Sequence, residues 1–276
     1  MSKIISILSG KGGVGKTTLT ANLSTVLQTE FGKNVAAVDG NITSPSLGLH
    51  FGFHEKFPVS LNDVLEGKLK IQKCVYVHPS IGVSIIPCNF SFYSDKNVDK
   101  LKKVIKGLKY DYIIIDSAPG LGKEAITAME AADEIIVITV PQFVDISNAL
   151  KTLQLARKMR KRIIGVVLNR VQNAEHEISE AEIEKLCGCK ILAEIPEDKE
   201  VQKSTYRGMP LIVEKPNSGT ADRFRQVAQA LGLKASVPEH HKKVHKEEKK
   251  HHEEPLGDLT FLDKLSGKQK KHKKKK

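Results

Sequence analysis

Short and nearly continuous apolar runs recur along the first 233 residues, and they limit the folds open to this chain more than any other feature. Runs in which polar and apolar residues do not alternate are typical of parallel strands that are buried on both faces of a sheet. We therefore expect strands at residues 4–8, 35–38, 83–86, 112–115, 134–139, 163–168 and 190–195.

Stretches with the apolar spacing of amphipathic helices lie between these runs. They predict helices at residues 17–27, 98–107, 123–132, 146–160, 177–186 and 220–231. Strands that alternate with helices favour an α/β fold, in which helices cover both faces of a doubly wound, mostly parallel sheet with right-handed crossovers. We predict one such three-layer domain over residues 1–233.

The composition changes abruptly after Leu233. Residues 234–276 contain 14 lysines and seven acidic residues, so this segment carries +7 of the chain's net charge of +12. Because it has few apolar residues, it cannot bury enough surface to offset the entropy of ordering. We predict a disordered Lys/His/Glu-rich tail, interrupted by a short apolar segment at residues 255–265. That segment is either a poor amphipathic membrane anchor, because Asp258 falls inside its apolar arc, or a docking segment for a protein partner.

Composition also excludes several classes of protein. Hydrophobic residues make up 40% of the chain and charged residues 28%, which excludes collagen-like, fully disordered and disulfide-scaffold proteins. No apolar run approaches the ~20 residues of a membrane-spanning helix, and the N-terminal run lacks a small-residue cleavage site. We therefore expect a cytoplasmic chain with four free thiols, which reaches the inner face of the membrane only peripherally, through the tail.

A glycine-rich loop joins the first predicted strand to the first predicted helix. Gly10, Gly15, Lys16 and Thr17 fit the pattern G-x-x-x-x-G-K-[ST] in the strand–loop–helix context that this pattern requires. Its backbone N–H groups form a nest for phosphate oxygens at the positive end of a helix. We expect Lys16 on the β- and γ-phosphates and the Thr17 hydroxyl on Mg²⁺. The predicted nucleotide-binding residues here are Gly10, Lys11, Gly12, Gly13, Val14, Gly15, Lys16, Thr17 and Thr18.

A second lysine, Lys11, lies inside this loop. The sequence GKGGVGKTT at residues 10–18 resembles the deviant Walker A motif of the MinD/ParA superfamily of ATPases. The resemblance implies a P-loop NTPase fold of the SIMIBI type that uses ATP and Mg²⁺, and a homodimer in the ATP-bound state. It also implies that Lys11 acts in trans, on the nucleotide of the partner subunit. A charge supplied in this way is worth about 10³–10⁵ in rate in related systems.

Two acidic positions at strand ends complete the expected catalytic site. Asp116 ends a buried run in IIIDSAPG, residues 113–120, which resembles the Walker B motif of the superfamily and implies a place near Mg²⁺. Asp39 resembles the acid of the first switch and is a second expected metal-site residue. Asn41 stands where a second aspartate is usual, and an amide cannot take a proton from water. The other two expected catalytic residues are Lys11 and Lys16. Because Asn41 replaces a carboxylate, we expect slow or partner-stimulated hydrolysis of ATP.

The resemblance also predicts a base-binding region. Asn169 and Arg170 end the sixth predicted strand, where the superfamily has an N-R pair that borders the adenine. Pro196, Glu197 and Asp198 begin a segment, residues 195–212, that resembles the part of MinD covering the other side of the nucleotide.

Three functions remain open at this level. The first is a MinD-type ATPase that positions cell division or polar assemblies, together with an activator or cargo protein. The second is a ParA-type ATPase that binds DNA nonspecifically, for which the candidate surface is the cationic cluster at residues 157–162, although such a cluster also complements a helix dipole. The third is an iron–sulfur carrier, but Cys187 and Cys189 supply only half of a tetrahedral site. Residues 139–145 differ from MinD near the expected dimer face, which leaves the choice of partner open.

Overall fold

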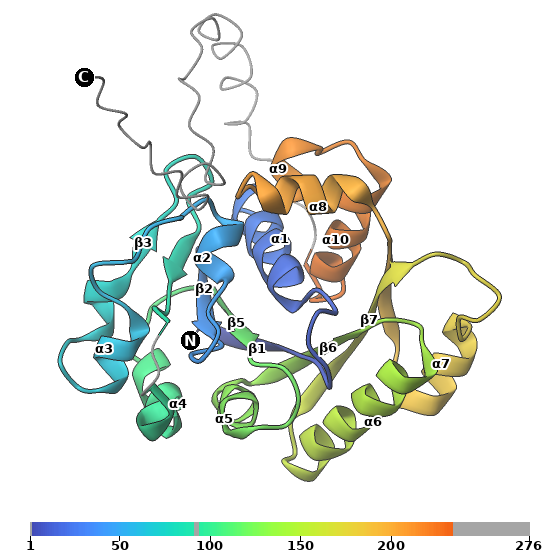
Figure 1. Cartoon of the computed structure of the whole chain (residues 1–276), viewed down its shortest axis with the longest axis horizontal. Coiled ribbons are helices and arrows are strands. Elements are labelled where there is room, and N and C mark those ends of the chain that lie inside the picture. The colour runs from blue at the N-terminus through green and yellow to red at the C-terminus, as the bar shows by residue number, and fades with distance from the viewer. Residues whose placement is uncertain (1, 91–93, 234–276) are drawn as a thin grey trace, which may run out of the picture. The chain divides into compact units, whose positions relative to one another are not determined.

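The computed structural model describes residues 2–90 and 94–233. These residues form an eight-stranded sheet with the strand order β3-β4-β2-β5-β1-β6-β7-β8, shown in Figure 1. All neighbouring strands are parallel except β3 and β4. The predicted α/β fold with a mostly parallel, doubly wound sheet is confirmed. The strands are β1 (Lys3–Leu8), β2 (Val35–Gly40), β3 (Tyr76–Val77), β4 (Ser84–Ile86), β5 (Tyr112–Ser117), β6 (Glu134–Thr139), β7 (Arg162–Val171) and β8 (Ile191–Pro196).

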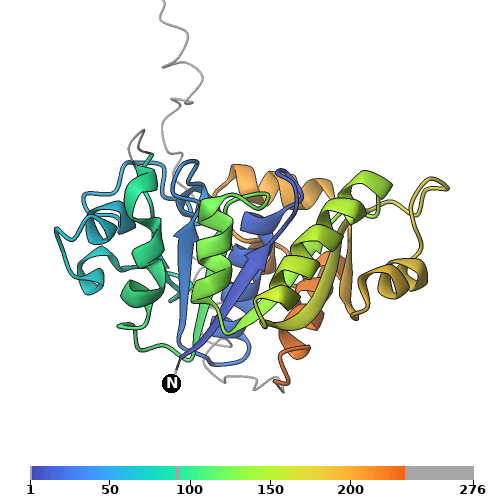
Figure 2. The same ribbon diagram turned by 90° about the horizontal axis from the view of Figure 1, so that it is seen from below.

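Helices cover both faces of this sheet. Helices α1 (Lys16–Thr29) and α10 (Gly219–Gln229) pack on one face, while α4 (Leu101–Ile105), α5 (Lys123–Ala131), α6 (Phe143–Lys158) and α7 (Glu180–Cys187) pack on the other. Figure 2 shows α4, α5 and α6 in front of the sheet. None of the helices in the described part of the chain is both long and apolar enough to span a membrane.

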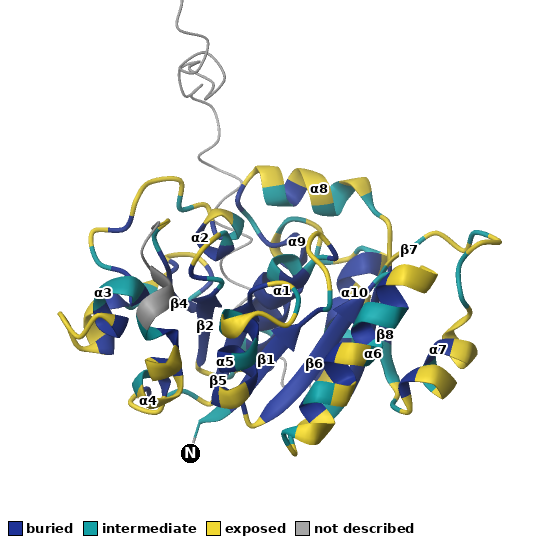
Figure 3. Ribbon diagram, turned by 60° about the horizontal axis from the view of Figure 1, so that its bottom comes forward, coloured by how far each residue is buried: buried dark blue, intermediate teal, exposed yellow. Residues whose placement is uncertain are grey.

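The side chains of strand β1 contribute to the hydrophobic core on both faces of the sheet. Ile5 and Ile7 pack under α1 and α10, whereas Ile4 and Leu8 pack with the helices of the opposite face. Successive side chains of a strand point to opposite faces, so a strand in the middle layer must be apolar on both. Figure 3 shows the strands as the buried centre of the molecule.

Several short elements were not predicted as separate elements. They are α2 (Leu47–His50), α3 (Leu61–Leu65), η1 (Ile71–Cys74), α8 (Lys199–Tyr206) and α9 (Leu211–Glu214), together with strand β3. The helices of four or five residues and the two-residue strand β3 carry too few apolar positions to establish a period, and α8 has Val201 as its one aliphatic residue. The helix predicted at residues 98–107 is in fact a 3₁₀ segment, η2 (Ser94–Lys100), followed by α4. The predicted disordered tail at 234–276, with its apolar segment at 255–265, lies outside the described residues.

The order of the strands positions the functional site. The chain passes from β1 to β2 on one side of the sheet, and strands β6, β7 and β8 extend the sheet on the other side of β1. Ligands of open α/β sheets bind at the carboxyl ends of the strands, where the direction of winding reverses. The loop that follows β1 lies at this point.

Candidate functional site

The phosphate loop connects β1 to α1 and depends on glycine at two positions of its backbone. Gly13 and Gly15 have φ angles of 77° and 101°, in the left-handed region that favours glycine. A Cβ on Gly15 would lie 2.2 Å from the Nδ2 atom of Asn169. The loop ends at the N-terminus of α1, with its glycines in conformations that a phosphate nest uses.

Lys16 is buried beneath this loop and is 7% exposed. Its Nζ atom donates a hydrogen bond to the Ser9 hydroxyl at 2.8 Å. Burial lowers the pKa of Lys16, and the nearby Asp116 carboxylate partly opposes this effect. A buried ammonium with one neutral partner is poised to bind an anion, because a phosphate supplies the charge compensation that the protein leaves incomplete.

Asp39 and Asp116 lie side by side at the carboxyl ends of β2 and β5. The two residues are direct neighbours in the parallel register, and each is only 1% exposed. The Thr17 hydroxyl donates a hydrogen bond to Asp116 Oδ2 at 2.7 Å. The structure thus brings together Thr17, Asp39 and Asp116, the three residues predicted for the metal site.

Burial raises the pKa of both carboxyl groups. The pKa of Asp116 rises to about 6, while the Thr17 hydroxyl and Lys16 act in the opposite direction. The pKa of Asp39 rises well above its usual value through burial and the charge of Asp116, although backbone N–H groups partly stabilise the carboxylate. Two buried carboxyl groups at paired positions of neighbouring strands favour a shared cation, because a cation offsets the desolvation cost of both carboxylates and their mutual repulsion.

The donor set fits Mg²⁺. Asp116 Oδ1 is buried and makes no hydrogen bond within 3.5 Å to the described residues, although the nearby Thr20 hydroxyl acts to lower the pKa of Asp116. Mg²⁺ prefers oxygen ligands and is usually held by one or two carboxylates, water and substrate phosphates. Thr17, Asp116 and Asp39 would hold the ion directly or through water. When bound, Mg²⁺ neutralises charge on the phosphates during phosphoryl transfer.

The segment after β2 wraps around the Asp39 carboxylate. Oδ1 accepts a hydrogen bond from the Asn41 N–H at 3.1 Å, and Oδ2 accepts from the N–H groups of Ser46 and Leu47 at 3.0 Å each. The Asn41 side chain donates to the Ser44 carbonyl at 2.6 Å. Asn41 therefore lies in the site, and in this state its amide stabilises the turn.

Two further residues of this segment reach the phosphate loop, and the sequence did not reveal them. The Ser46 hydroxyl lies 3.2 Å from Thr17 Oγ1. His50 contacts Thr18 Oγ1 through Nε2 at 3.4 Å and the Ser46 carbonyl through Nδ1 at 3.1 Å. Both lie in or beside α2, which is too short to show an apolar period, so no local signal could have found them.

Lys11 points toward helix α6. Its Nζ atom lies 3.3 Å from Asp145 Oδ1 and 3.4 Å from Oδ2. The Lys11 side chain is 55% exposed, whereas the Asp145 side chain is 2% exposed. The structure thus joins a predicted catalytic residue to a carboxylate that the sequence had placed only within a divergent segment.

Asn169 supports the phosphate loop from the end of β7. Its Nδ2 atom donates a hydrogen bond to the Val14 carbonyl at 2.7 Å, so the amide predicted to read the base also fixes the loop. Arg170 follows in the left-handed region with φ of 57°, at an irregularity in the β7–β8 pairing. Its Nε atom lies 3.6 Å from Glu197 Oε2, which connects the ends of the two strands.

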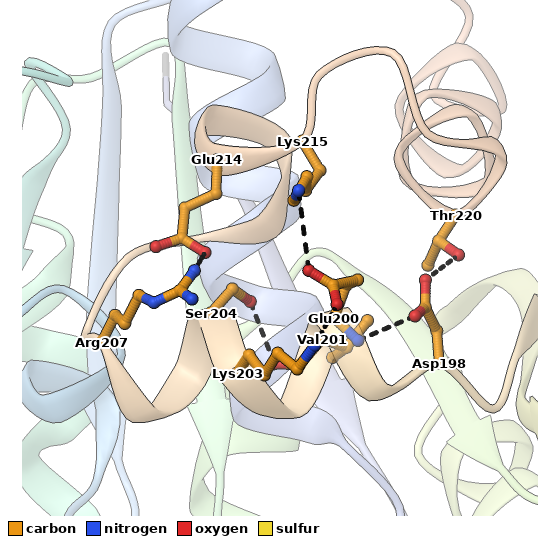
Figure 4. A network of polar contacts seen from close by, with 9 residues as sticks. All are labelled: Asp198, Glu200, Val201, Lys203, Ser204, Arg207, Glu214, Lys215 and Thr220. Carbon is orange, nitrogen blue, oxygen red and sulfur yellow. Dashed lines mark hydrogen bonds and ion pairs between the residues drawn. The ribbon is translucent and has the colours of Figure 1, made fainter.

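Asp198 begins helix α8, as Figure 4 shows. Its carboxylate accepts hydrogen bonds from the Glu200 N–H at 2.8 Å and from the Thr220 hydroxyl at 2.6 Å. Asp198 thereby caps α8 and ties it to α10. Pro196 and Asp198 also line a hollow of about 320 Å³ at the ends of β7 and β8. The base-binding residues predicted from the sequence therefore gather at one edge of the sheet, beside the phosphate loop.

The cationic cluster at residues 157–162 is largely engaged within the protein. Arg157 donates to carbonyls at the end of α7, and Lys161 donates to carbonyls at the end of α5. Arg162 pairs with Glu134 at 2.7 Å. Three of the five cations thus stabilise helix ends or a buried carboxylate, which leaves Lys158 and Arg160 for a ligand.

Cys187 is the last residue of α7, and Cys189 lies in the turn between α7 and β8. Cys187 is buried, and burial raises its pKa to about 11. Burial also raises the pKa of Cys189. In the ranges 2–90 and 94–233, no group of three or more His, Cys, Asp or Glu side chains is placed to hold a metal ion.

Comparison with known proteins gives the family. The sequence profile of the ParA family, described as an NUBPL iron-transfer P-loop NTPase, matches residues 1–232. The chain belongs to the ParA/MinD family of P-loop NTPases. An uncharacterized ATP-binding protein from Methanocaldococcus jannaschii is 38% identical over 235 residues, which make up 84% of this chain and 88% of that protein.

Solved structures of MinD proteins resemble this ParA/MinD-family chain closely. MinD from Pyrococcus horikoshii, in complex with Mg-ADP, is 37% identical with a TM-score of 0.79 and covers 84% of this chain and 96% of its own. A chain of the MinC:MinD cell division complex from Aquifex aeolicus is 28% identical with a TM-score of 0.76, over 86% of this chain and 98% of that one. ATP and Mg²⁺ are the cofactors that the family and the site support.

Proposed function

We propose that this chain is a MinD-type ATPase that forms a homodimer when ATP is bound and, as a dimer, binds a surface or a partner protein. Hydrolysis of ATP returns the chain to the monomer and ends this binding. The biological role would be the spatial positioning of cell division or of polar assemblies, at the inner face of the cytoplasmic membrane. Two observations support this choice over the DNA-partitioning alternative. The chain is similar to MinD proteins. Three of the five cations at residues 157–162 already bind carbonyl groups or a carboxylate within the chain.

The observation that carries the proposal is the position of Lys11. Its ammonium group lies outside its own phosphate nest, on an exposed edge of the loop. Phe143 and Val144, in the first turn of α6 beside Asp145, are 77% and 63% exposed. An exposed apolar pair beside an exposed lysine is suited to contact with a second copy of the chain, in which Lys11 would reach the facing nucleotide.

Separate residues of the site would bind the phosphates and the metal ion. The loop N–H groups and Lys16 would bind and orient the phosphates, which is the main contribution of the protein to phosphoryl transfer. Thr17, Asp116 and Asp39 would hold the metal ion. Asn41 occupies the place expected for a carboxylate and cannot accept a proton from water, so turnover would be slow until a partner acts.

Measurement of molar mass by light scattering tests the proposal directly. The wild-type chain should be monomeric with ADP and dimeric with a non-hydrolysable ATP analogue. Lys11→Ala should bind the analogue and remain monomeric, whereas Lys16→Ala should not bind it. A wild-type chain that binds the analogue and remains monomeric would refute the proposal, and DNA retention that depends on Lys158 and Arg160 would favour the partitioning function.

A further inference from the structure

The excess positive charge of residues 1–233 is concentrated in two short segments. Residues 66–73 and 99–111 contain eight lysines and three acidic residues, a net charge of +5. Residues 1–233 as a whole also have a net charge of +5, so cations and anions balance over the rest of that range. Such an uneven distribution in a folded domain marks one surface as electrostatically distinct.

The two segments lie side by side in the fold. The Gln72 side chain in η1 donates to the Gly107 carbonyl after α4 at 3.3 Å, and Lys100 Nζ donates to the Leu65 carbonyl at 3.3 Å. Figure 1 shows α3 and α4 at the end of the sheet that carries β3. The segments therefore form one continuous surface.

Helix α4 directs its lysines outward. Its residues Leu101 and Ile105 are buried, as is Leu108 just after it, so the opposite side of this stretch is exposed. We use the name lysine face for six exposed residues of the two segments: Lys70, Lys73, Lys102, Lys103, Lys106 and Lys109. The face lies away from the phosphate loop, because Lys109 precedes β5 whereas Asp116 lies near the carboxyl end of that strand.

None of the six lysines makes a hydrogen bond or an ion pair through its side chain with another residue that the structure describes. In this they differ from the cluster at 157–162, where three of five cations are engaged. Unpaired like charges on adjacent segments repel one another, and an external polyanion would relieve that repulsion.

One apolar side chain stands within this basic surface. Leu69 is 41% exposed and lies between Lys68 and Lys70 in the loop after α3. An exposed leucine gains nothing from a phosphodiester backbone, but it gains free energy at the boundary of a bilayer. All six cations of the face are lysines. The face therefore has no arginine guanidinium, which is the group that binds a single phosphate through two parallel hydrogen bonds. These features favour a lipid surface over nucleic acid.

We infer that the lysine face is a docking surface for an anionic lipid bilayer, at which lysines bind lipid headgroups and Leu69 enters the interface. This contact lies outside the nucleotide site and is separate from the ATP-dependent binding of the proposed function. It needs neither ATP nor a second copy, and hydrolysis ends only the binding that depends on the dimer. Each lysine near an anionic bilayer contributes about 1 kcal/mol. Six of them form a surface that remains effective at physiological salt.

The test uses the full chain, so that the basic tail contributes equally to every sample. Binding to vesicles of phosphatidylcholine with and without phosphatidylserine is measured by sedimentation, without nucleotide. The variant Lys70→Gln, Lys73→Gln, Lys103→Gln should lose at least about tenfold in affinity for the anionic vesicles. The matched control Lys151→Gln, Lys185→Gln, Lys190→Gln removes the same charge from exposed positions elsewhere and should change affinity less than about twofold.

A second variant distinguishes the lipid from other polyanions. Leu69→Ser should weaken vesicle binding severalfold, most clearly at high salt, and should leave the retention of DNA fragments unchanged. Equal losses for the two triple variants would overturn the inference, because binding would then depend on net charge and not on the lysine face. No loss for either variant would also overturn it, because the tail alone would then account for binding. Loss of DNA binding without loss of vesicle binding would assign the face to nucleic acid and overturn it as well. Thermal unfolding by circular dichroism confirms that each variant is folded.

Discussion

Lys11 and Asp145 form an ion pair within a single chain, with Nζ 3.3 Å from Oδ1. The lysine extends from the phosphate loop and the aspartate from the first turn of α6, 134 residues later. Asp145 is almost fully buried, so departure of Lys11 leaves a carboxylate with little solvation. Under the proposed function, Lys11 cannot both hold Asp145 and reach the nucleotide of a partner. The pair therefore opposes dimerisation until a nucleotide competes for the lysine.

Asp145→Asn should raise the dimer fraction severalfold at a fixed concentration of a non-hydrolysable ATP analogue. The amide keeps the shape of the side chain but no longer attracts Lys11, whose exposed end limits the gain to about 1 kcal/mol. Analytical ultracentrifugation measures the dimer fraction. The double variant Lys11→Ala, Asp145→Asn should be monomeric, and a single variant with the dimer fraction of the wild type would show that the ion pair does not control assembly.

Lys16→Ala should reduce ATP affinity at least about 100-fold, because charge-assisted hydrogen bonds to phosphates contribute about 1.5–3 kcal/mol each. Isothermal titration calorimetry gives the affinity. Lys33→Ala is the matched control, because it removes a lysine from the loop before β2, at the amino end of the sheet, and should bind normally. Tight ATP binding by Lys16→Ala would contradict the assignment of the phosphate nest.

Asn41→Asp should raise the basal rate of ATP hydrolysis at least about tenfold if the missing carboxylate limits turnover, since general bases contribute about 10²–10⁴. Asn41→Ala is the control for loss of the hydrogen bond to the Ser44 carbonyl and should not accelerate hydrolysis. Phosphate release measured without any partner reports the rate. An unchanged rate in Asn41→Asp would place the limit in another step, such as opening of the dimer.

Asp116→Asn should stabilise the nucleotide-free chain above pH 6. Burial raises the pKa of Asp116 from 3.8 to about 6, so the protonated group favours folding below pH 4 and that stability is lost as the pH rises through 6. Urea unfolding at pH 5 and pH 8 should show a loss of stability in both chains, because Asp39 also has a raised pKa, but the loss should be about 1.4 kcal/mol larger in the wild type than in the variant.

The variant of an exposed carboxylate, Asp99→Asn, should follow the pH dependence of the wild type. Mg²⁺ with ATP should restore stability to the wild type at pH 8 and have little effect on Asp116→Asn. Identical pH profiles for the wild type and Asp116→Asn would show that ionisation of Asp116 does not oppose folding.

The sequence alone predicted the layers of the fold and most of the phosphate site. Strands buried on both faces must be apolar throughout, so β1, β5 and β6 were visible as runs of isoleucine and valine. The phosphate loop was visible because its chemistry is local: glycines, a lysine and a threonine act within nine consecutive residues. Asp39 and Asp116 were visible because each ends a buried run at the functional edge of a parallel sheet.

Contacts between distant segments were decided only by the tertiary structure. The pairing of Lys11 with Asp145, the reach of His50 to Thr18, and the use of Arg157 and Lys161 at helix ends depend on how the helices pack. The lysine face likewise appears only when residues 66–73 lie beside residues 99–111. Local sequence determines which residues can form an element, whereas charges far apart in the chain meet only after burial of the apolar faces has fixed the positions of those elements.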